Sequence, residues 1–384
     1  MAAERADRWS TVPVRRRVLG VVRTLTALDR LHDVFGVLAD DFRVEVRFAV
    51  AEGSEFSDRL AEHLHAAGMT VVDWQDATKE HFDLAISPSS NGALHELDVP
   101  LLTLPHGAGY HKLRPTDSGV AGAISGLAPE QLLHNGRVVA SVLALSHDDQ
   151  LDLLRRSCPQ AAERAAVVGD PCFDRLRASV PMRAHYRSAM SGGKLVMVSS
   201  TWGGESLFAR QPDLAARLVA QLPGDHRVAL VLHPNIWSRH GAWQIDRWTR
   251  GAQRAGLIVV PPHRGWRAAL VASDVVLADH GSLALYAAAL GKPLLLAEFG
   301  AAEVAAGTPA ADLGTRAQFL GPGDLRSQVD GAIPLPEHAS FAARTFAAPG
   351  GSTARLRAVI YDQLGLPEPD YPARPEPVEV FAGS

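Results

Sequence analysis

Short apolar segments alternate with longer amphipathic segments along almost the whole chain, and this alternation sets the fold class. The short segments are typical of strands buried on both faces. Between them, segments such as Leu25–Ala39 and Ser57–Ala67 repeat apolar residues at three- and four-residue spacing, which predicts helices. Strands that alternate with helices form parallel sheets covered on both faces. The predicted strands are Arg17–Val22, Val44–Val50, Thr70–Trp74, Leu84–Ser87, Pro100–Leu104 and Val139–Leu145 in the first half, and Leu195–Ser199, Val228–Leu232, Leu257–Val260, Val275–Ala278 and Leu294–Ala297 in the second.

A pause in the strand pattern divides the chain into two α/β domains. The pattern stops within Arg177–Gly193, and 384 residues with 47% hydrophobic composition are ample for two cores. We expect an N-terminal domain over residues 1–180 and a C-terminal domain over 190–345. Residues 346–364 are expected to form a helix that packs back on the first domain. The Pro- and Glu-rich residues 365–384 are expected to be extended or disordered.

The segment that begins at Val275 holds the most informative turn of the sequence. An apolar run ends in four polar or small residues, and a helix is predicted over Leu283–Leu290. The turn consists of Asp279, His280, Gly281 and Ser282. A Gly-Ser start leaves backbone N–H groups free at the positive end of the helix dipole, which favours a phosphate. The simpler interpretation is an ordinary strand–helix turn with Ser282 as the N-cap.

Similar polar turns follow four of the predicted strands. They are Leu104–Gly109, Ser199–Trp202, His233–Asn235 and Asp279–Ser282. Two Rossmann-like domains in sequence leave a cleft between the carboxyl ends of their sheets. We therefore expect all four turns to line one ligand cleft.

Composition narrows the classes of function. The formal net charge of −4 gives no electrostatic support for nucleic-acid binding. Cys158 and Cys172 are too few for a disulfide framework or a cysteine zinc site, so we expect a cytoplasmic setting and no cofactor or metal. No apolar run is long enough to span a bilayer. Arg15–Arg17 leave a peripheral membrane contact open, although a solvated flank is the simpler interpretation.

Five short motifs also occur in a fixed order. They are His106-Gly107, VVGDPCFDRL (167–176), SSTW (199–202), LHP (232–234) and ADHGS followed by GKP (278–293). Their order and spacing resemble the CDP-glycerol glycerophosphotransferase family of the GT-B superfamily. The second half also resembles UDP-N-acetylglucosamine 2-epimerases. The resemblance implies an α/β GT-B fold, in which two Rossmann-like domains face a central cleft, and a nucleotide-activated small-molecule donor with a hydroxyl acceptor.

The resemblance implies roles for the cleft residues. His106 would be the general base for the acceptor hydroxyl, since imidazole titrates near neutrality. His233 would bind the donor phosphate or protonate the leaving group, although either histidine could instead be a hydrogen-bonded structural residue. Donor- or phosphate-binding roles fall to Ser200, Thr201, Asp279, His280, Gly281 and Ser282, and acceptor-side or phosphate roles to Gly107, Lys112 and Arg114.

Three positions depart from the family pattern. Cys172 and Gly203 stand where two motifs of the family have arginine, and Tyr286 stands where the family has an acidic residue near the donor ribose. A carboxylate accepts two hydrogen bonds from a ribose diol, which a phenol does poorly. These departures weigh against CDP-glycerol itself as the donor.

The segment Ile236–Trp248 carries Trp237, Trp243 and Trp248 at helix-like spacing. Packing between a helix and the sheet is the favoured interpretation, and nucleobase stacking is the alternative. No segment resembles the basic, helical membrane-contact region expected of a polymerase that extends a lipid-linked primer.

Three functions are compatible with these patterns. The first is a GT-B transferase that moves a glycerophosphate or glycosyl group without a metal, in keeping with the absence of a D-x-D motif. The second is a sugar-nucleotide epimerase or hydrolase, which should place several acidic residues at the strand ends, where few occur. The third is a catalytically degenerate GT-B binding module, which the missing arginines and Tyr286 favour. The donor base, the transferred group, the acceptor and the oligomeric state stay open.

Overall fold

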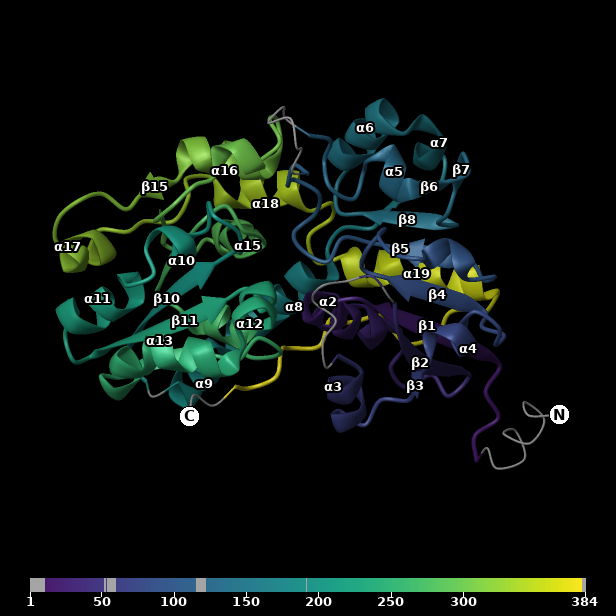
Figure 1. Ribbon diagram of the computed structural model, residues 1–384, viewed down its shortest axis with the longest axis horizontal. Coiled ribbons are helices and arrows are strands. Elements are labelled where there is room, and N and C mark those ends of the chain that lie inside the picture. The colour runs from purple at the N-terminus through teal and green to yellow at the C-terminus, as the bar shows by residue number, and fades with distance from the viewer. Residues whose placement is uncertain (1–10, 52, 54–59, 115–121, 191, 382–384) are drawn as a thin grey trace.

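Two parallel sheets, one in each half of the chain, form the framework of the protein (Figure 1). The computed structural model describes residues 11–51, 53, 60–114, 122–190 and 192–381. Within these residues the N-terminal sheet has seven strands in the order β3-β2-β1-β4-β5-β8-β9. The C-terminal sheet of the described chain has six strands in the order β12-β11-β10-β13-β14-β15. The predicted α/β class with two parallel-sheet domains is confirmed.

The strands follow the predicted apolar segments closely. In the N-terminal domain they are β1 (Arg16–Val22), β2 (Val44–Val50), β3 (Val71–Val72), β4 (Leu84–Ser87), β5 (Leu101–Thr103), β8 (Val142–Leu145) and β9 (Ala165–Val167), with a separate hairpin of β6 (Leu133–His134) and β7 (Arg137–Val138). In the C-terminal domain they are β10 (Lys194–Ser200), β11 (His226–Leu232), β12 (Leu257–Val260), β13 (Val275–Ala278), β14 (Leu294–Leu296) and β15 (Gln318–Phe319). The edge strands β9 and β15 lie outside the predicted segments.

Helices cover both faces of each sheet. Those of the N-terminal half are α2 (Leu25–Phe35), α3 (Leu60–Ala66), α4 (Trp74–Ala77), α5 (Pro129–Leu132), α6 (Asp148–Ser157) and α7 (Pro159–Ala162). The remaining helices are α8 (Pro171–Ser179), α9 (Arg183–Ala189), α10 (Leu207–Arg210), α11 (Leu214–Gln221), α12 (Pro234–His240), α13 (Ala242–Arg254), α14 (Trp266–Ala272), α15 (Ser282–Ala289), α16 (Pro309–Arg316), α17 (Leu325–Asp330), α18 (His338–Thr345) and α19 (Ser352–Leu364). The predicted helix Leu25–Ala39 is split, because α2 gives way to a 3₁₀ turn at Gly36–Leu38. The first residues of the predicted helix Ser57–Ala67 lie outside the described residues.

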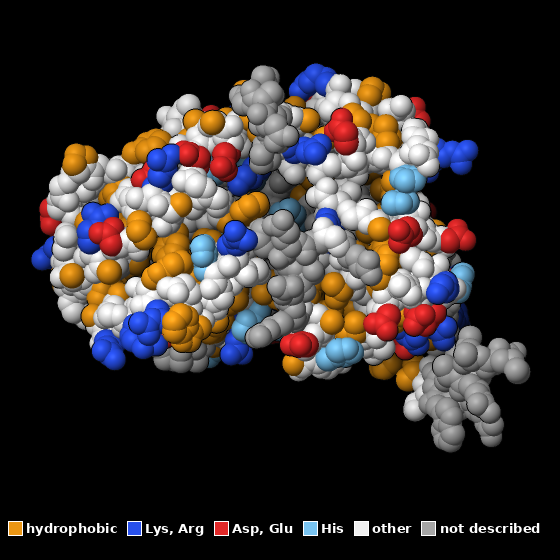
Figure 2. All heavy atoms as spheres, viewed as in Figure 1, with side chains coloured by type: hydrophobic (Ala, Val, Ile, Leu, Met, Phe, Trp, Pro, Cys, Tyr) orange, Lys and Arg blue, Asp and Glu red, His pale blue; other side chains and the backbone are white. Residues whose placement is uncertain are grey.

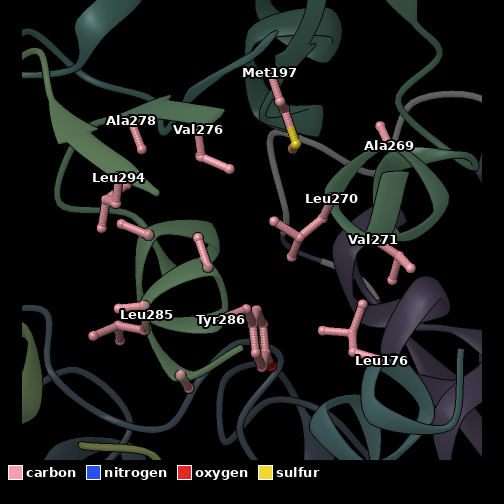
Figure 3. Close-up of a cluster of buried hydrophobic side chains, with 14 of the residues drawn as sticks. Leu176, Met197, Ala269, Leu270, Val271, Val276, Ala278, Leu285, Tyr286 and Leu294 are labelled. Atoms are coloured by element: carbon pink, nitrogen blue, oxygen red, sulfur yellow. The ribbon is translucent and has the colours of Figure 1, made fainter. Parts of the chain in front are cut away.

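Alternate residues of β10 enter two different cores. Leu195 and Met197 face the core that also contains α14 and α15, and Val196 and Val198 face the core built on α11. Figure 3 shows Met197 pointing into the space that residues of α14 and α15 also fill. Burial on both faces explains why the strand is a continuous apolar run rather than an alternating one.

Helix α19 returns to the N-terminal domain after the chain has completed the C-terminal sheet (Figure 1). Its residues Leu356, Ile360 and Leu364 are buried together with Val18 of β1 and Ile86 of β4. The last helix therefore completes the core of the first sheet.

Residues 366–381, for which an extended or disordered tail is expected, contain no helix or strand; residues 382–384 lie outside the described chain. The Val378 N–H donates to Ser179 Oγ at 2.9 Å, and the Tyr186 hydroxyl donates to the Val378 carbonyl at 2.7 Å. Phe381 packs on Gly265, whose φ of +91° suits glycine and where a Cβ would stand 2.6 Å from the ring. These two hydrogen bonds and the packing of Phe381 hold the tail against the C-terminal domain.

No helix within the described residues is long and apolar enough to cross a membrane.

Candidate functional site

A cleft of about 960 Å³ lies between the two domains, at the carboxyl ends of both sheets. In each sheet the strand order changes direction there, between β1 and β4 and between β10 and β13. Ligands of open α/β sheets bind at such switch points. All of the predicted site residues line this cleft: Gly107, His106, Lys112, Arg114, Ser200, Thr201, His233, Asp279, His280, Gly281 and Ser282.

Asp279 organises the turns on the C-terminal side of the cleft. Its carboxylate is buried and accepts hydrogen bonds from the backbone N–H groups of Thr201 at 2.8 Å, Leu207 at 2.9 Å and Gly281 at 3.0 Å. The Ser200 hydroxyl lies 3.3 Å from the same carboxylate. Desolvation raises the pKa of Asp279, and the backbone donors oppose that rise. Asp279 and Ser200 therefore fix the loops that present Thr201 and Gly281.

The turn after β5 touches the start of α15 directly. The Ala108 N–H donates to Ser282 Oγ at 3.2 Å, so the Ser282 hydroxyl links the two domains. A Cβ at Gly107 would stand 2.5 Å from the same oxygen, which explains glycine at this position. No side chain caps the first turn of α15 within the described chain. The Ala284 N–H donates to the Gly281 carbonyl at 3.1 Å, which leaves the Ser282 and Leu283 N–H groups for an anion.

His106 extends into the cleft from the N-terminal domain, and its ring is exposed there. A ring N–H donates to the backbone carbonyl of Pro88. The other ring nitrogen is left as an acceptor. Desolvation by the cleft walls, followed by the charges of Arg30 and Lys112, lowers the pKa of His106 to about 4. The neutral imidazole therefore dominates at pH 7.

His233 caps α12 from the opposite domain. Its Nδ1 accepts the Asn235 N–H at 3.1 Å, which places the proton of the neutral ring on Nε2. Desolvation, with the nearby His106 and Lys112, lowers the pKa of His233 to about 3. At neutral pH this ring is a neutral hydrogen-bond donor.

Lys112 belongs to a chain of contacts across the domain boundary. Its ammonium lies 2.9 Å from Glu303 and 4.9 Å from the centre of the Trp202 ring. His280 accepts the Gly300 N–H at Nδ1 and lies 3.1 Å from Glu303 through Nε2. The hydrogen bond from His280 and the charge of Lys112 lower the pKa of Glu303 to about 2. His280 is therefore a buried support, whereas Lys112 stays at the cleft wall.

Arg114 lies at the edge of the cleft, where it pairs with Glu130 at 3.2 Å on the exposed surface.

Tyr286 does not present its phenol to a ligand. The residue is 2% exposed, its hydroxyl donates to Asp170 at 2.9 Å, and Arg30 donates to that hydroxyl at 2.9 Å. Arg30 also pairs with Asp170 at 2.8 Å. Desolvation raises the pKa of Tyr286 well above its usual range. The position expected to face a ribose thus holds the domains together.

A second buried cluster joins α14 to α2 on the cleft floor. Arg267 lies 2.5 Å from Asp29 and 2.6 Å from Asp33, and Trp266 Nε1 donates to Asp29 at 2.9 Å. Arg175 reaches Asp33 from α8 at 2.9 Å. These residues escape sequence prediction because they come from three helices, α2, α8 and α14, that lie far apart in the chain.

Comparisons with known proteins identify the fold. The sequence matches no protein-family profile and no curated protein. A structure of the wall teichoic acid polymerase TagF is similar with a TM-score of 0.58 at 12% identity, over 91% of this chain and 89% of that chain. The S. aureus MnaA–UDP co-structure is similar with a TM-score of 0.54 at 14% identity, over 95% of this chain and 100% of that chain. The chain has the predicted GT-B fold.

Proposed function

We propose that the protein is a GT-B transferase that moves a glycerophosphate or glycosyl group from a nucleotide-activated donor to a hydroxyl acceptor without a metal ion. The observation that carries the proposal is His106, a neutral imidazole with one acceptor nitrogen, exposed in the cleft that His233 and the start of α15 also line. The similarity of fold to TagF and to UDP-bound MnaA supports a nucleotide donor.

In the proposed reaction, His106 takes the proton of the acceptor hydroxyl as its oxygen attacks the donor. The bond between the transferred group and the nucleotide phosphate breaks, and that phosphate leaves with the bonding electron pair. Its charge is met by the first-turn N–H groups of α15, by the ammonium of Lys112 and by the Nε2–H of His233. Thr201 offers a hydroxyl from a loop fixed by Asp279.

Titration calorimetry with CDP, UDP, GDP and ADP in the presence of EDTA tests the donor side. We expect micromolar binding of one nucleotide. Activity with the donor of that base then tests the chemistry, with release of the free nucleotide as the readout. Binding of none of the four contradicts the proposal.

The variant His106→Ala separates catalysis from binding. Loss of a general base lowers turnover by about 10²–10⁴-fold, while nucleotide affinity stays close to that of the wild type. His81→Ala is the matched control, because His81 is 86% exposed on the surface. The wild-type kcat/KM should fall as the pH is lowered toward about 4, where His106 becomes protonated. Full turnover by His106→Ala contradicts the assigned role.

A binding module without turnover is the second candidate. The observation in its favour is that polar groups of the cleft already bind one another. Arg30, Asp170 and Tyr286 form hydrogen bonds among themselves, and the Ala108 N–H donates to the Ser282 hydroxyl. This candidate predicts tight nucleotide binding, no turnover with any acceptor, and no effect of His106→Ala beyond a change in affinity.

A further inference from the structure

The peptide unit that directly follows His106 is held from both domains. The Gly107 carbonyl accepts a hydrogen bond from Arg30 Nη2 at 2.6 Å, and the N–H of the same peptide, on Ala108, donates to Ser282 Oγ at 3.2 Å. Arg30 comes from α2 of the N-terminal domain, and Ser282 begins α15 of the C-terminal domain. Because a peptide unit is planar, hydrogen bonds at both of its ends fix its orientation. The backbone that carries His106 is therefore fixed across the domain boundary.

Arg30 is buried at the centre of this contact. Figure 2 shows Lys and Arg side chains scattered over the surface of both halves of the molecule, whereas Arg30 is 3% exposed, the lowest fraction among the described arginines. A buried guanidinium needs partners for its N–H groups. Arg30 finds them in Asp170 at 2.8 Å, in the Tyr286 hydroxyl at 2.9 Å and in the Gly107 carbonyl. Because the guanidinium is a rigid planar fork, it fixes the positions of these three partners relative to one another.

Helix α15 acts on the same peptide through two side chains. Ser282 and Tyr286 are four residues apart and so lie on one face of this helix. Ser282 contacts the N–H side of the peptide directly, and Tyr286 contacts the carbonyl side through Arg30. A shift of α15 away from the N-terminal domain would break both contacts. The position of His106 therefore depends on the closed arrangement of the two domains.

The charge of Arg30 also acts on the His106 ring. Desolvation is the largest cause that lowers the pKa of His106, and the charge of Arg30 is the next, ahead of that of Lys112. The other titratable groups that interact electrostatically with this ring are His111 and His233. A nearby cation disfavours the imidazolium. Arg30 thus fixes the backbone beside the ring and favours the neutral form, which can accept a proton.

We propose that Arg30 is the positioning residue for His106 and that it holds the turn at Gly107 in the orientation set by α15 of the C-terminal domain. This inference rests on the proposed role of His106 as general base. It also gives a reason for Tyr286 where the family that the sequence resembles has an acidic residue. The phenol accepts a hydrogen bond from Arg30 and donates one to Asp170, whereas a carboxylate can only accept.

Steady-state kinetics of Arg30→Lys test the positioning. Lysine keeps the positive charge, but one ammonium cannot replace the planar fork that reaches all three partners. We expect kcat to fall about 10–100-fold, because a misplaced base slows the reaction, while the KM of the donor changes less than about twofold. The acid limb of the pH profile should stay in place, since the charge beside His106 is kept. Wild-type kcat in Arg30→Lys overturns the proposal.

NMR titration of the histidine rings tests the same link without any need for turnover. Arg30→Met/Asp170→Asn removes the cation and leaves no buried carboxylate unpaired, so the variant avoids the main cause of misfolding. The His106 resonance, assigned by its loss in His106→Ala, should titrate at least about one pH unit higher in this variant than in the wild type. The acid limb of kcat/KM should move to higher pH by the same amount.

The matched control is Arg357→Met. Arg357 is 7% exposed, pairs with Glu368 at 2.8 Å and does not line the cleft, so this variant should lose stability but keep kcat and the His106 titration. An unchanged His106 titration in Arg30→Met/Asp170→Asn, or an equal shift in Arg357→Met, overturns the proposal. A shifted titration without turnover in the wild type upholds the link from Arg30 to His106 and contradicts the transferase proposal alone.

Discussion

Replacement of Arg267 by methionine tests whether the buried ion cluster joins the two domains. Methionine keeps an unbranched apolar stem but removes the guanidinium and the charge that Asp29 and Asp33 share. The Arg267 and Asp33 side chains are 10% and 0% exposed, so water cannot replace the lost partner easily. The change therefore removes the charged link between α14 and α2, together with the Arg267 hydrogen bonds to the Asp29 carbonyl and to Cys172 Sγ.

The expected loss of stability follows from the remaining partners. Removal of one member of a buried ion pair costs about 3–5 kcal/mol. Arg175 still lies 2.9 Å from Asp33, and Trp266 still donates to Asp29 at 2.9 Å. We therefore expect the lower end, about 3 kcal/mol, for Arg267→Met.

Urea denaturation of both proteins at pH 7 and at pH 4 provides the measurement. Burial raises the pKa of Asp33, but the charges of Arg267, Arg30 and Arg175 outweigh it and hold the pKa below its usual range. A carboxyl with a lowered pKa stabilises the fold above its unfolded pKa, and that stability is lost as the pH falls through the folded value. Arg267→Met raises the pKa of Asp33, so the difference between the two proteins should be largest at pH 7 and smaller at pH 4.

Two controls make the result specific. Arg326→Met removes an exposed cation on α17 and should cost less than about 0.5 kcal/mol. In a double-mutant cycle with Asp33→Asn, the coupling to Arg267 should exceed about 1 kcal/mol. A loss under about 1 kcal/mol for Arg267→Met, or a difference that does not change between pH 7 and pH 4, refutes the reasoning.

Three further variants test other contacts. Gly107→Ala places a Cβ 2.5 Å from Ser282 Oγ, and we expect it to lower the stability by about 1–3 kcal/mol in thermal unfolding. The double variant Gly107→Ala/Ser282→Gly should recover most of that loss. An unchanged unfolding midpoint for Gly107→Ala would contradict the contact. Tyr186→Phe leaves the Val378 carbonyl without its donor and should cost about 1 kcal/mol and increase protease cleavage of the tail; wild-type cleavage would show that this bond does not hold the tail. Glu303→Gln should lower the free energy of unfolding by about 1 kcal/mol in urea denaturation at every pH from 5 to 8. A carboxylate whose pKa is lowered to about 2 stabilises the fold fully above its unfolded pKa, and this stability is lost only as the pH falls toward 2. A loss of stability that varies between pH 5 and pH 8 would refute this.

The strands and the cleft could be predicted from the sequence because both depend on local patterns. Each buried strand is an apolar run, and the polar turn after it lies at the carboxyl edge of its sheet. His106 and His233 are 127 positions apart in the chain, yet this rule alone places both in one cleft. The prediction needed no knowledge of the angle between the domains.

The hydrogen-bond and ion-pair partners of the polar side chains in the cleft could not be predicted in this way. Tyr286 meets Arg30, 256 residues earlier in the chain, only because α15 and α2 come together across the domain boundary. Glu303 ends a single 3₁₀ turn, Ala301–Glu303, which is too short to show a periodic sequence pattern. Helix-like spacing of Trp243 and Trp248 predicted packing against the sheet, but both are exposed, because Ile245 and Thr249 are the residues of α13 that are buried. Pairing between distant helices is set by the tertiary packing and has no local signature.

Because α19 returns to the first domain, the N-terminal domain cannot finish folding until almost the whole chain has been synthesised. Multidomain chains usually fold from the N-terminus as the ribosome releases them. Here Val18 and Ile86 cannot gain their α19 neighbours until residue 364 has been made. While the second domain is being translated, the face of the N-terminal sheet that α19 will cover therefore remains partly exposed. The first domain to begin folding is the last to be finished, and a ribosome that stalls after residue 345 leaves it exposed to chaperones and proteases.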